Sequence, residues 1–425
     1  MRRKSFRPRV RDGDMRQLLT IRNSKVDICR QTSYHDAGRI IQTEVFEMTQ
    51  NNKTGKVSSR DSVLHLLETR KGNFISGEEI ANELGISRTA VWKAVKRLRD
   101  EGCRIDAVTN KGYRLSHDSD ILSAEEIRIW IRKLLSGTKT GDAAPASSPS
   151  LSEHAELSIR SLQLDVFDSI DSTNSYCLKK AQEGAADGLI AVAGRQTRGR
   201  GRRGRSFFSP EDTGLYLSIL IRPFGILGER AVKFTTIAAV AVSEAIEAVS
   251  GKPAQIKWVN DIFVDGHKVC GILTEASFNL EDNTLDYAVV GIGINVYEPE
   301  GGFPENIRDI AGAVWTDDPN DPASNTVLRS GGRNRLAAEV ITRFYCYLLQ
   351  ELGGYTHTPL LHGRKYIDEY RARCFVTGHR VDVIKAGSNP VRALVTGVDD
   401  ECRLLVTYDD GTSEVLNSGE ISIRT

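Results

Sequence analysis

Four short clusters between Asp171 and Asn295 combine polar, cationic and glycine residues that suit the binding of a small polar ligand and a phosphate. The first is the run Ser172, Thr173 and Asn174, which opens a segment with helical spacing. Hydroxyl and amide side chains at a helix N-terminus can hydrogen-bond a neutral polar ligand such as a cyclic urea. Taken alone, such a run is more typical of a simple helix cap.

The second cluster is the arginine–glycine run GRQTRGRGRRGR, residues 194–205. Glycine lets the backbone approach a ligand closely, and the planar guanidinium of arginine suits phosphate. The alternative is an RGG-like nucleic-acid segment or a solvated loop. Against it, the run is followed at once by SFFSP, residues 206–210, and by the strand-like residues 215–221. A disordered tail would not lie between strands, so we favour a ligand-binding loop.

The third cluster is KWVND, residues 257–261, within strand-like sequence that continues to a tight turn at residues 265–266. A lysine buried among strands is costly unless it has an anionic partner. We therefore interpret Lys257 as a group that meets an anionic ligand. The alternative is a lysine at a strand edge that reaches water.

The fourth cluster is VVGIGINV, residues 289–296. Alternating glycines in a strand indicate a backbone that lies close to a ligand. Taken alone, a bulge or a crowded strand crossing explains the pattern equally simply.

Together the clusters resemble the biotin–protein ligase family. The STN run, GRGRRGR, KWVND, the GIL-E segment of residues 271–275 and GIGIN occur in the order of that family, with Val259 where the family usually has proline. The resemblance covers nearly all of residues 58–425. It implies an α/β multidomain fold with an N-terminal winged helix-turn-helix, a central mixed α+β ligase domain of the class II synthetase type and a small SH3-like β-barrel at the C-terminus.

The resemblance implies a two-step reaction. Biotin and ATP give biotinyl-5′-AMP and pyrophosphate, and a lysine of a biotin carrier protein, a subunit of acetyl-CoA carboxylase, then attacks the mixed anhydride. Neither step needs a nucleophile from the enzyme, so positioning and charge stabilisation would carry catalysis. An adenylate hydrolyses readily, so the arginine–glycine loop would have to close over it and exclude water.

The same resemblance implies residue roles. Lys257 would neutralise charge where the biotin carboxylate meets the α-phosphate, and Asp261 would lie beside Mg²⁺. The catalytic residues would be Lys257, Arg202 and Arg205. The biotin-binding residues would be Ser172, Thr173, Asn174, Gln196, Arg200, Gly201, Arg202 and Lys257. The nucleotide-binding residues would be Arg205, Asn260, Asp261, Gly291, Gly293 and Asn295.

Three questions stay open at the level of sequence. Trp315 either stacks on adenine or belongs to the core. A lipoyl ligase would share the fold and the adenylate chemistry, although GRGRRGR with KWVND favours biotin. The third question is whether the chain is a bifunctional protein. The alternatives are a ligand-sensing transcription factor without catalysis and a ligase whose helix-turn-helix does not regulate transcription.

Residues 58–115 have the pattern of a winged helix-turn-helix. Ser76 caps one helix, Gly85 allows a sharp turn, and a second helix over residues 88–100 carries apolar residues on one face and basic residues on the other. The segment from Gly102 to Leu115 is typical of a β-wing. We expect Arg88, Thr89 and Lys93 to contact DNA. A basic surface helix of a protein–protein module is the alternative. The segment resembles the DNA-binding domain of repressor members of the family.

The pattern predicts four parts. Residues 1–56 form a tail with a basic start, 57–117 the winged helix-turn-helix domain, 118–373 the ligase domain and 374–425 the C-terminal β domain. The tail is interpreted as solvated chain or as sequence upstream of a true start, and alternatively as a basic arm on DNA. Residues 136–156, rich in Ala, Ser, Pro and Gly, are interpreted as a flexible linker.

The composition of the chain limits which classes of protein it can belong to. The chain has 425 residues, 27% of them charged and 40% hydrophobic, and a net charge of +1, so any DNA contact must come from a local basic face. The 7 cysteines form no Cys-x-x-Cys pair, which favours reduced thiols in a cytoplasm. Residues 231–249 contain three charges and are expected to form a buried helix rather than a membrane span. The expected partners are the carrier domain, operator DNA and, with adenylate bound, a second copy of the chain.

Overall fold

The computed structural model describes residues 59–70, 72–100, 103, 105–116, 120–136, 159–223, 226–279, 281, 283–316, 332–352, 364–385, 389–417 and 420–422. The predicted tail, residues 1–56, and nearly all of the predicted linker, residues 136–156, lie outside these ranges.

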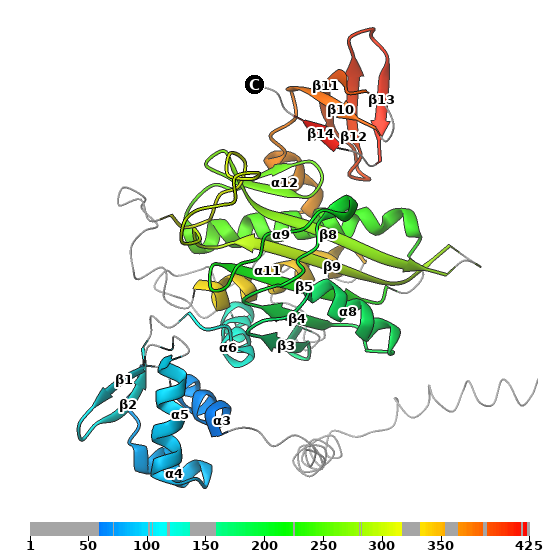
Figure 1. Ribbon diagram of the computed structural model, residues 1–425. Helices are drawn as coiled ribbons and strands as arrows, with labels where there is room; N and C mark the ends of the chain where they lie inside the picture. The colour runs from blue at the N-terminus through cyan, green and yellow to red at the C-terminus, as the bar shows by residue number, and fades with distance from the viewer. Residues whose placement is uncertain are drawn as a thin grey trace, which may run out of the picture. The chain divides into compact units, whose positions relative to one another are not determined.

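The N-terminal part is a winged helix-turn-helix, as the sequence predicts (Figure 1). Ser76 begins the second helix by accepting a hydrogen bond from the Glu79 backbone at 3.0 Å, and Gly85 ends it in a left-handed conformation at φ 63°. A small core of apolar residues holds the helices and the wing together. The elements are α3 (Ser59–Thr69), α4 (Gly77–Leu84), α5 (Arg88–Asp100), β1 (Ile105–Val108) and β2 (Gly112–Leu115).

The central part is a seven-stranded mixed sheet in the order β3-β4-β5-β9-β8-β7-β6. Only β3 and β4 run parallel to each other, and the other neighbours pair antiparallel. The strands are β3 (Gln163–Phe167), β4 (Leu189–Ala193), β5 (Gly214–Ile221), β6 (Gln255–Lys257), β7 (Asp261–Val264), β8 (His267–Phe278) and β9 (Leu285–Asn295).

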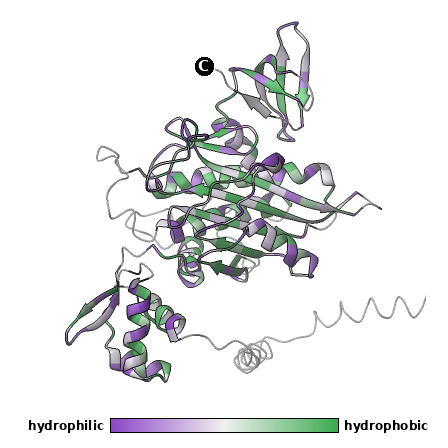
Figure 2. Ribbon diagram, viewed as in Figure 1, coloured by the Kyte–Doolittle hydropathy of each residue, from purple (hydrophilic) through white to green (hydrophobic). Residues whose placement is uncertain are grey.

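Helices cover both faces of this sheet. In β4, Ile190 and Val192 pack into the main core with α9, whereas Leu189 and Ala191 pack into a second cluster with α8. Figure 2 shows hydrophobic residues concentrated in these strands and helices. The helices and 3₁₀ turns are α6 (Ala124–Leu135), α8 (Thr173–Gln182), η1 (Arg202–Gly204), η2 (Gly228–Arg230), α9 (Ala231–Ser250), α11 (Gly332–Glu351) and α12 (Tyr366–Arg373).

Helix α9 is the buried helix that residues 231–249 predict. Every residue from Lys233 to Ile246 is buried, including Glu244, whose carboxylate accepts hydrogen bonds from Arg343 at 2.8 Å and Tyr347 at 2.9 Å. The charged residues of α9 are therefore paired inside the protein. Among the described helices, none combines the length and the apolar character that a bilayer crossing requires.

Asp120, which precedes α6, has a largely buried carboxylate, with its side chain 15% exposed. Asp120 accepts hydrogen bonds from the Tyr297 hydroxyl at 2.7 Å and from the Arg333 backbone and guanidinium at 2.9 and 3.0 Å. Burial raises the pKa of Asp120, and Arg333 opposes this rise. Asp120 is therefore held against α11 by an ion pair.

The C-terminal part is a five-stranded antiparallel sheet in the order β13-β12-β11-β10-β14. This small β domain confirms the expected C-terminal element. Its inward side chains, such as Val381, Val395 and Leu404, join the main core. The Trp258 indole donates to the Cys402 carbonyl at 3.0 Å, so the KWVND segment also contacts this domain. The strands are β10 (Arg380–Ile384), β11 (Val391–Val398), β12 (Leu404–Tyr408), β13 (Ser413–Leu416) and β14 (Glu420–Ser422).

Candidate active site

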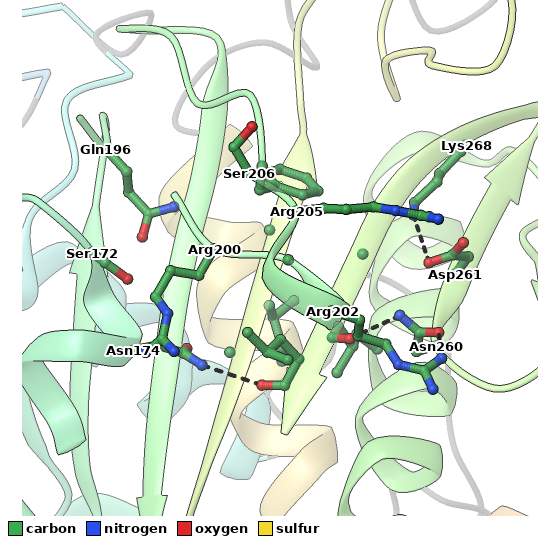
Figure 3. Close-up of a pocket in the computed structure, with 18 of the residues that line it drawn as sticks. Ser172, Asn174, Gln196, Arg200, Arg202, Arg205, Ser206, Asn260, Asp261 and Lys268 are labelled. Atoms are coloured by element: carbon green, nitrogen blue, oxygen red, sulfur yellow. Dashed lines mark hydrogen bonds and ion pairs between the residues drawn. The ribbon is translucent and has the colours of Figure 1, made fainter. Parts of the chain in front are cut away.

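A cavity of about 340 Å³ brings the four sequence clusters together (Figure 3). This volume lies within the range of small-molecule sites. Its walls are the N-terminus of α8, the arginine–glycine loop, the β6–β7 turn and strands β8 and β9. The predicted site residues that line it are Ser172, Thr173, Asn174, Gln196, Arg200, Gly201, Arg202, Arg205, Lys257, Asn260, Asp261, Gly291 and Gly293.

One wall is neutral and polar. The side chain of Ser172 caps α8, and the Thr173 backbone N–H donates to the Gln196 side-chain oxygen at 2.9 Å. The Gln196 amide nitrogen donates to Ser209 Oγ at 3.1 Å. The buried Ser218 hydroxyl lies 2.7 Å from the Thr173 hydroxyl. This wall presents hydroxyl and amide groups whose orientations the protein itself sets.

Asn174 is the most constrained member of this wall. Its Oδ1 accepts from the Ser218 hydroxyl at 2.6 Å, and its Nδ2 donates to Glu275 Oε2 at 3.0 Å and to the Leu273 carbonyl at 3.3 Å. Because oxygen and nitrogen have different partners, only one orientation of the amide satisfies them all.

The opposite wall is the arginine–glycine loop, which is tied back on itself. The Phe207 backbone donates to the Gly199 carbonyl at 2.9 Å, and the Gly201 backbone donates to the Arg205 carbonyl at 2.7 Å. Between these bonds the 3₁₀ turn η1 contains Arg203 at φ 56°. The loop is therefore a turn that is closed by its own backbone hydrogen bonds.

Two arginines connect the loop to the sheet. Arg200 Nη2 lies 2.8 Å from Glu275 Oε1 on β8, and Arg202 Nη1 lies 2.8 Å from Asn260 Oδ1 at the β6–β7 turn. The Asn260 side-chain amide donates to the Ile272 carbonyl at 2.9 Å, and the Ile272 backbone N–H donates to the Asn260 carbonyl at 3.0 Å. These contacts span three segments that are far apart in the sequence.

The strand end of the cavity carries lysines around one aspartate. Lys257 and Asp261 lie opposite each other in the backbone register of β6 and β7, and Lys268 Nζ lies 2.6 Å from Asp261 Oδ1. Lys268 was not among the predicted site residues. It follows an Asp-Gly turn in the sequence, where a lysine looks like an ordinary exposed turn residue.

Positively charged side chains outnumber negatively charged ones in the cavity lining. The cations that line it are Arg200, Arg202, Arg205, Lys257 and Lys268, whereas Asp261 is the carboxylate among its lining residues. Such an excess of positive charge suits a polyphosphate. Within the described part of the chain, no group of three or more His, Cys, Asp or Glu residues is placed to hold a metal ion. Asp261 alone does not make a metal site, although Mg²⁺ in nucleotide sites commonly takes only one or two carboxylates besides the phosphates.

The glycines of β9 are required by close packing. A Cβ added at Gly291 would lie 1.9 Å from Asn174 Oδ1, and one added at Gly293 would lie 2.7 Å from the Phe207 ring. Both glycines line the cavity, and at both positions a side chain would collide with a neighbouring side chain of the protein. The alternative of a crowded strand crossing therefore describes part of their role.

Two residues considered for the nucleotide side lie elsewhere. The Asn295 side chain does not line the cavity and donates to the Gly312 carbonyl at 3.0 Å. Trp315 is 1% exposed and packs on Tyr297, with ring centroids 5.6 Å apart, so it belongs to the core. Sequence reasoning missed several lining residues, namely Ser206, Phe207, Trp258, Lys268, Gly271, Ile272, Leu273, Ile292 and Ile384.

The thiols near the site are not poised as nucleophiles. Burial raises the pKa of Cys177 to about 12 and also raises the pKa of Cys270 well above its ordinary value. Both therefore remain protonated at neutral pH, which agrees with chemistry that needs no nucleophile from the protein.

A second hollow lies between α5 and the wing. It is lined by Arg88 and Thr89 of α5, the exposed Trp92, and residues 107–110 of the wing. Lys93 is exposed on the same helix but does not line the hollow. The structure thus places the three predicted DNA-contacting residues on the outward face of α5.

Comparison with known families agrees with the division of the chain into a helix-turn-helix part, a central domain and a C-terminal β domain. Residues 166–295 match the biotin/lipoate A/B protein ligase family, residues 60–114 match a helix-turn-helix domain, and residues 377–424 match the biotin protein ligase C-terminal domain.

Individual relatives extend the match over most of the chain. The bifunctional ligase/repressor BirA of Bacillus spizizenii is 32% identical over 84% of this chain and 97% of its own length. BirA of Escherichia coli is 32% identical over 83% of this chain and 94% of its own length. A solved biotin protein ligase from Aquifex aeolicus, in complex with biotin and ATP, aligns with 62% of this chain and 98% of its own at 25% identity and a TM-score of 0.46. On the identity and coverage of the first two relatives, this chain belongs to the BirA family of bifunctional ligase/repressor proteins.

Proposed function

We propose that the chain is an ATP-dependent biotin–protein ligase that forms biotinyl-5′-AMP and transfers biotin to a lysine of a biotin carrier protein, and that it also represses biotin genes in response to biotin. The observation that carries the ligase proposal is the juxtaposition, in one cavity, of a neutral hydroxyl and amide wall with five cations. A cyclic urea suits the first wall, and a polyphosphate suits the second.

In the first step, a carboxylate oxygen of biotin attacks the α-phosphate of ATP and pyrophosphate leaves. Two anions must approach each other, so the positive charge of Lys257 between them lowers the barrier. Arg202 and Arg205 hold the phosphates from the loop. Thr173, Asn174 and Gln196 hold the ureido ring, and the backbone of Arg200 and Gly201 covers it.

In the second step, the amine of the carrier lysine attacks the acyl carbon of the adenylate, AMP leaves, and the amine loses a proton. The chain contributes orientation and exclusion of water rather than a covalent intermediate. The loop formed by residues 199–205 closes over the adenylate and protects it from water until the carrier arrives.

Magnesium enters this proposal with the nucleotide. Asp261 is the carboxylate that would hold Mg²⁺ beside the phosphates, and Mg²⁺ would supply further positive charge for the departing pyrophosphate. Lys268 lies 2.6 Å from Asp261 and adds a fixed cation at the same end of the cavity.

The ligase proposal is tested by Lys257→Ala. We expect the rate of pyrophosphate exchange into ATP to fall at least about 100-fold, because a preorganised charge at the reacting centre is removed. Exchange is measured with wild type, Lys257→Ala and the control Lys252→Ala. Lys252 is a lysine that forms an ion pair with Asp265, at 3.4 Å, and does not line the cavity. Exchange at the wild-type rate in Lys257→Ala would reject the assignment.

Substrate and regulatory alternatives are separated by one set of assays. ATP-dependent labelling of a carrier domain with biotin, and none with lipoate, supports the ligase and excludes a lipoyl ligase. A gel shift with DNA upstream of the biotin genes, with and without biotin and ATP, tests repression. Labelling without any shift identifies a ligase alone, and a shift without labelling identifies a sensor without catalysis. ATP, the carrier and operator DNA meet in the cytoplasm, where we place the protein.

A further inference from the structure

Glu275 has no role in the mechanism above, although it ends the GIL-E segment. It lies on β8, and its carboxylate contacts one residue from each wall of the cavity. Its Oε2 accepts from Asn174 Nδ2 at 3.0 Å, and its Oε1 accepts from Arg200 Nη2 at 2.8 Å. Asn174 belongs to the neutral wall and Arg200 to the arginine–glycine loop. One carboxylate thus joins the two walls, and Figure 3 shows Arg200 beside Asn174.

Both ends of this bridge are well defined. On the wall side, the bond from Ser218 to Asn174 Oδ1, at 2.6 Å, turns the Asn174 amide nitrogen toward Glu275. On the loop side, the guanidinium carries a full charge, and a hydrogen bond between two charged groups is stronger than one between neutral groups. The Glu275 side chain is 24% exposed and that of Arg200 is 42% exposed, so water weakens this ion pair only in part.

We propose that Glu275 is a positioning residue that fastens the arginine–glycine loop to the biotin-side wall and so keeps the adenylate enclosed. This inference rests on the proposed ligase function. Its consequence is kinetic. The bridge governs how often the adenylate is transferred to the carrier and how often it escapes into water, where it hydrolyses to biotin and AMP.

The hydrogen bonds of the Glu275 carboxylate indicate which substitution breaks the bridge with the least change in shape. Glutamine has the shape of glutamate but only one acceptor oxygen, and its NH₂ group is a donor. In Glu275→Gln, the single oxygen serves either Asn174 or Arg200, and the NH₂ group faces a donor on the other side. The variant therefore breaks one of the two links while it keeps the volume of the side chain.

The experiment measures partition of the adenylate. Purified full-length protein is mixed with biotin, ATP, Mg²⁺ and a carrier domain, and biotinyl-5′-AMP released into solution is compared with biotinylated carrier. For Glu275→Gln we expect about a tenfold rise in the released fraction and a higher KM for biotin, the scale expected for loss of a hydrogen bond to a charged group. A merely structural role would lower thermal stability and kcat without changing this partition.

Two further variants keep the inference falsifiable. Arg200→Gln removes the loop end of the bridge from a side chain that is partly exposed, and the double variant completes a cycle. We expect Arg200→Gln to raise release as Glu275→Gln does, and the double variant to be no worse than the single variants. The control is Glu211→Gln, because Glu211 forms an ion pair of similar length, 2.9 Å, with Arg195 at the start of the same segment and is 64% exposed.

Normal partition in Glu275→Gln, or in Arg200→Gln, would overturn the inference while the ligase function stands. Absence of any adenylate in the wild-type protein would instead overturn the proposed function, and this inference with it.

Discussion

Asn174 illustrates how single residues of this site are held by other parts of the protein. Its amide has partners on β5 and β8, and its oxygen lies directly above Gly291 of β9. The helix cap at Ser172 was predictable from sequence because a cap is a local pattern. The partners Ser218 and Glu275 were not, because they lie 44 and 101 residues away along the chain.

At this scale we predict that Gly291→Ala impairs biotin binding. The new methyl group would lie 1.9 Å from Asn174 Oδ1, so Asn174 or the strand must move. Overpacking of this kind costs about 1–3 kcal/mol, and a rise of roughly tenfold or more in the dissociation constant for biotin is expected. Calorimetric titration of the protein with biotin measures it.

The matched control is Gly397→Ala, another glycine within a strand. Its added Cβ would have a nearest neighbour at 4.0 Å, the Leu405 side chain, so neither binding nor stability should suffer. Wild-type affinity in Gly291→Ala would show that Asn174 does not need its present position.

Helix α5 is the element whose two faces have separate tasks. Val91, Val95 and Leu98 are buried in the core of the winged helix-turn-helix, whereas Arg88 and Thr89 face outward at its N-terminal turn. Helical periodicity made both faces and the bounds of the helix predictable. The exposed Trp92 lies beside them on α5.

At the scale of this element we predict that Arg88→Ala weakens operator binding about tenfold or more, because a base or phosphate contact is lost. A gel shift with DNA upstream of the biotin genes measures the affinity, and carrier labelling should stay at the wild-type level. Lys179→Ala, which removes an exposed lysine of α8, is the control for a general loss of charge. Equal affinity of Arg88→Ala and wild type would contradict the assignment.

At the scale of the whole molecule, DNA binding and catalysis reside in separate parts of one chain. Asp120, which follows the wing in the sequence, is held by Tyr297 and Arg333, which lie 177 and 213 residues further along the chain. Tyr297 follows β9, whose glycines line the cavity. Asp120 therefore contacts a residue, Tyr297, that closely follows a strand of the active site.

We predict that the adenylate promotes pairing of two chains, which would bring two helix-turn-helix domains to a palindromic operator. Sedimentation velocity should show a shift toward dimer when biotin and ATP are added together, and none with either alone. Lys257→Ala, which should not form the adenylate, should remain unshifted. The same sedimentation coefficient for wild type with and without both substrates would reject ligand-dependent pairing.

The sequence by itself determined the local elements and their order. Ser76 and Gly85 mark the two ends of one helix through a side-chain cap and a left-handed turn, and the structure has α4 between them. Four motifs with their family order were enough to predict thirteen of the residues that line the cavity, as named above. The helix ends depend on neighbours within a few positions, so they can be predicted without the fold, whereas the thirteen cavity residues followed from the resemblance to the ligase family.

Only the tertiary structure decided which distant residues meet. Strand order places β8 between β9 and β7, and this brings Lys268 to Asp261 and Glu275 to Arg200. The structure also places the Asn295 side chain against the Gly312 carbonyl, outside the cavity lining. Neither result follows from spacing along the chain, because pairing between strands is set by the packing of the whole sheet.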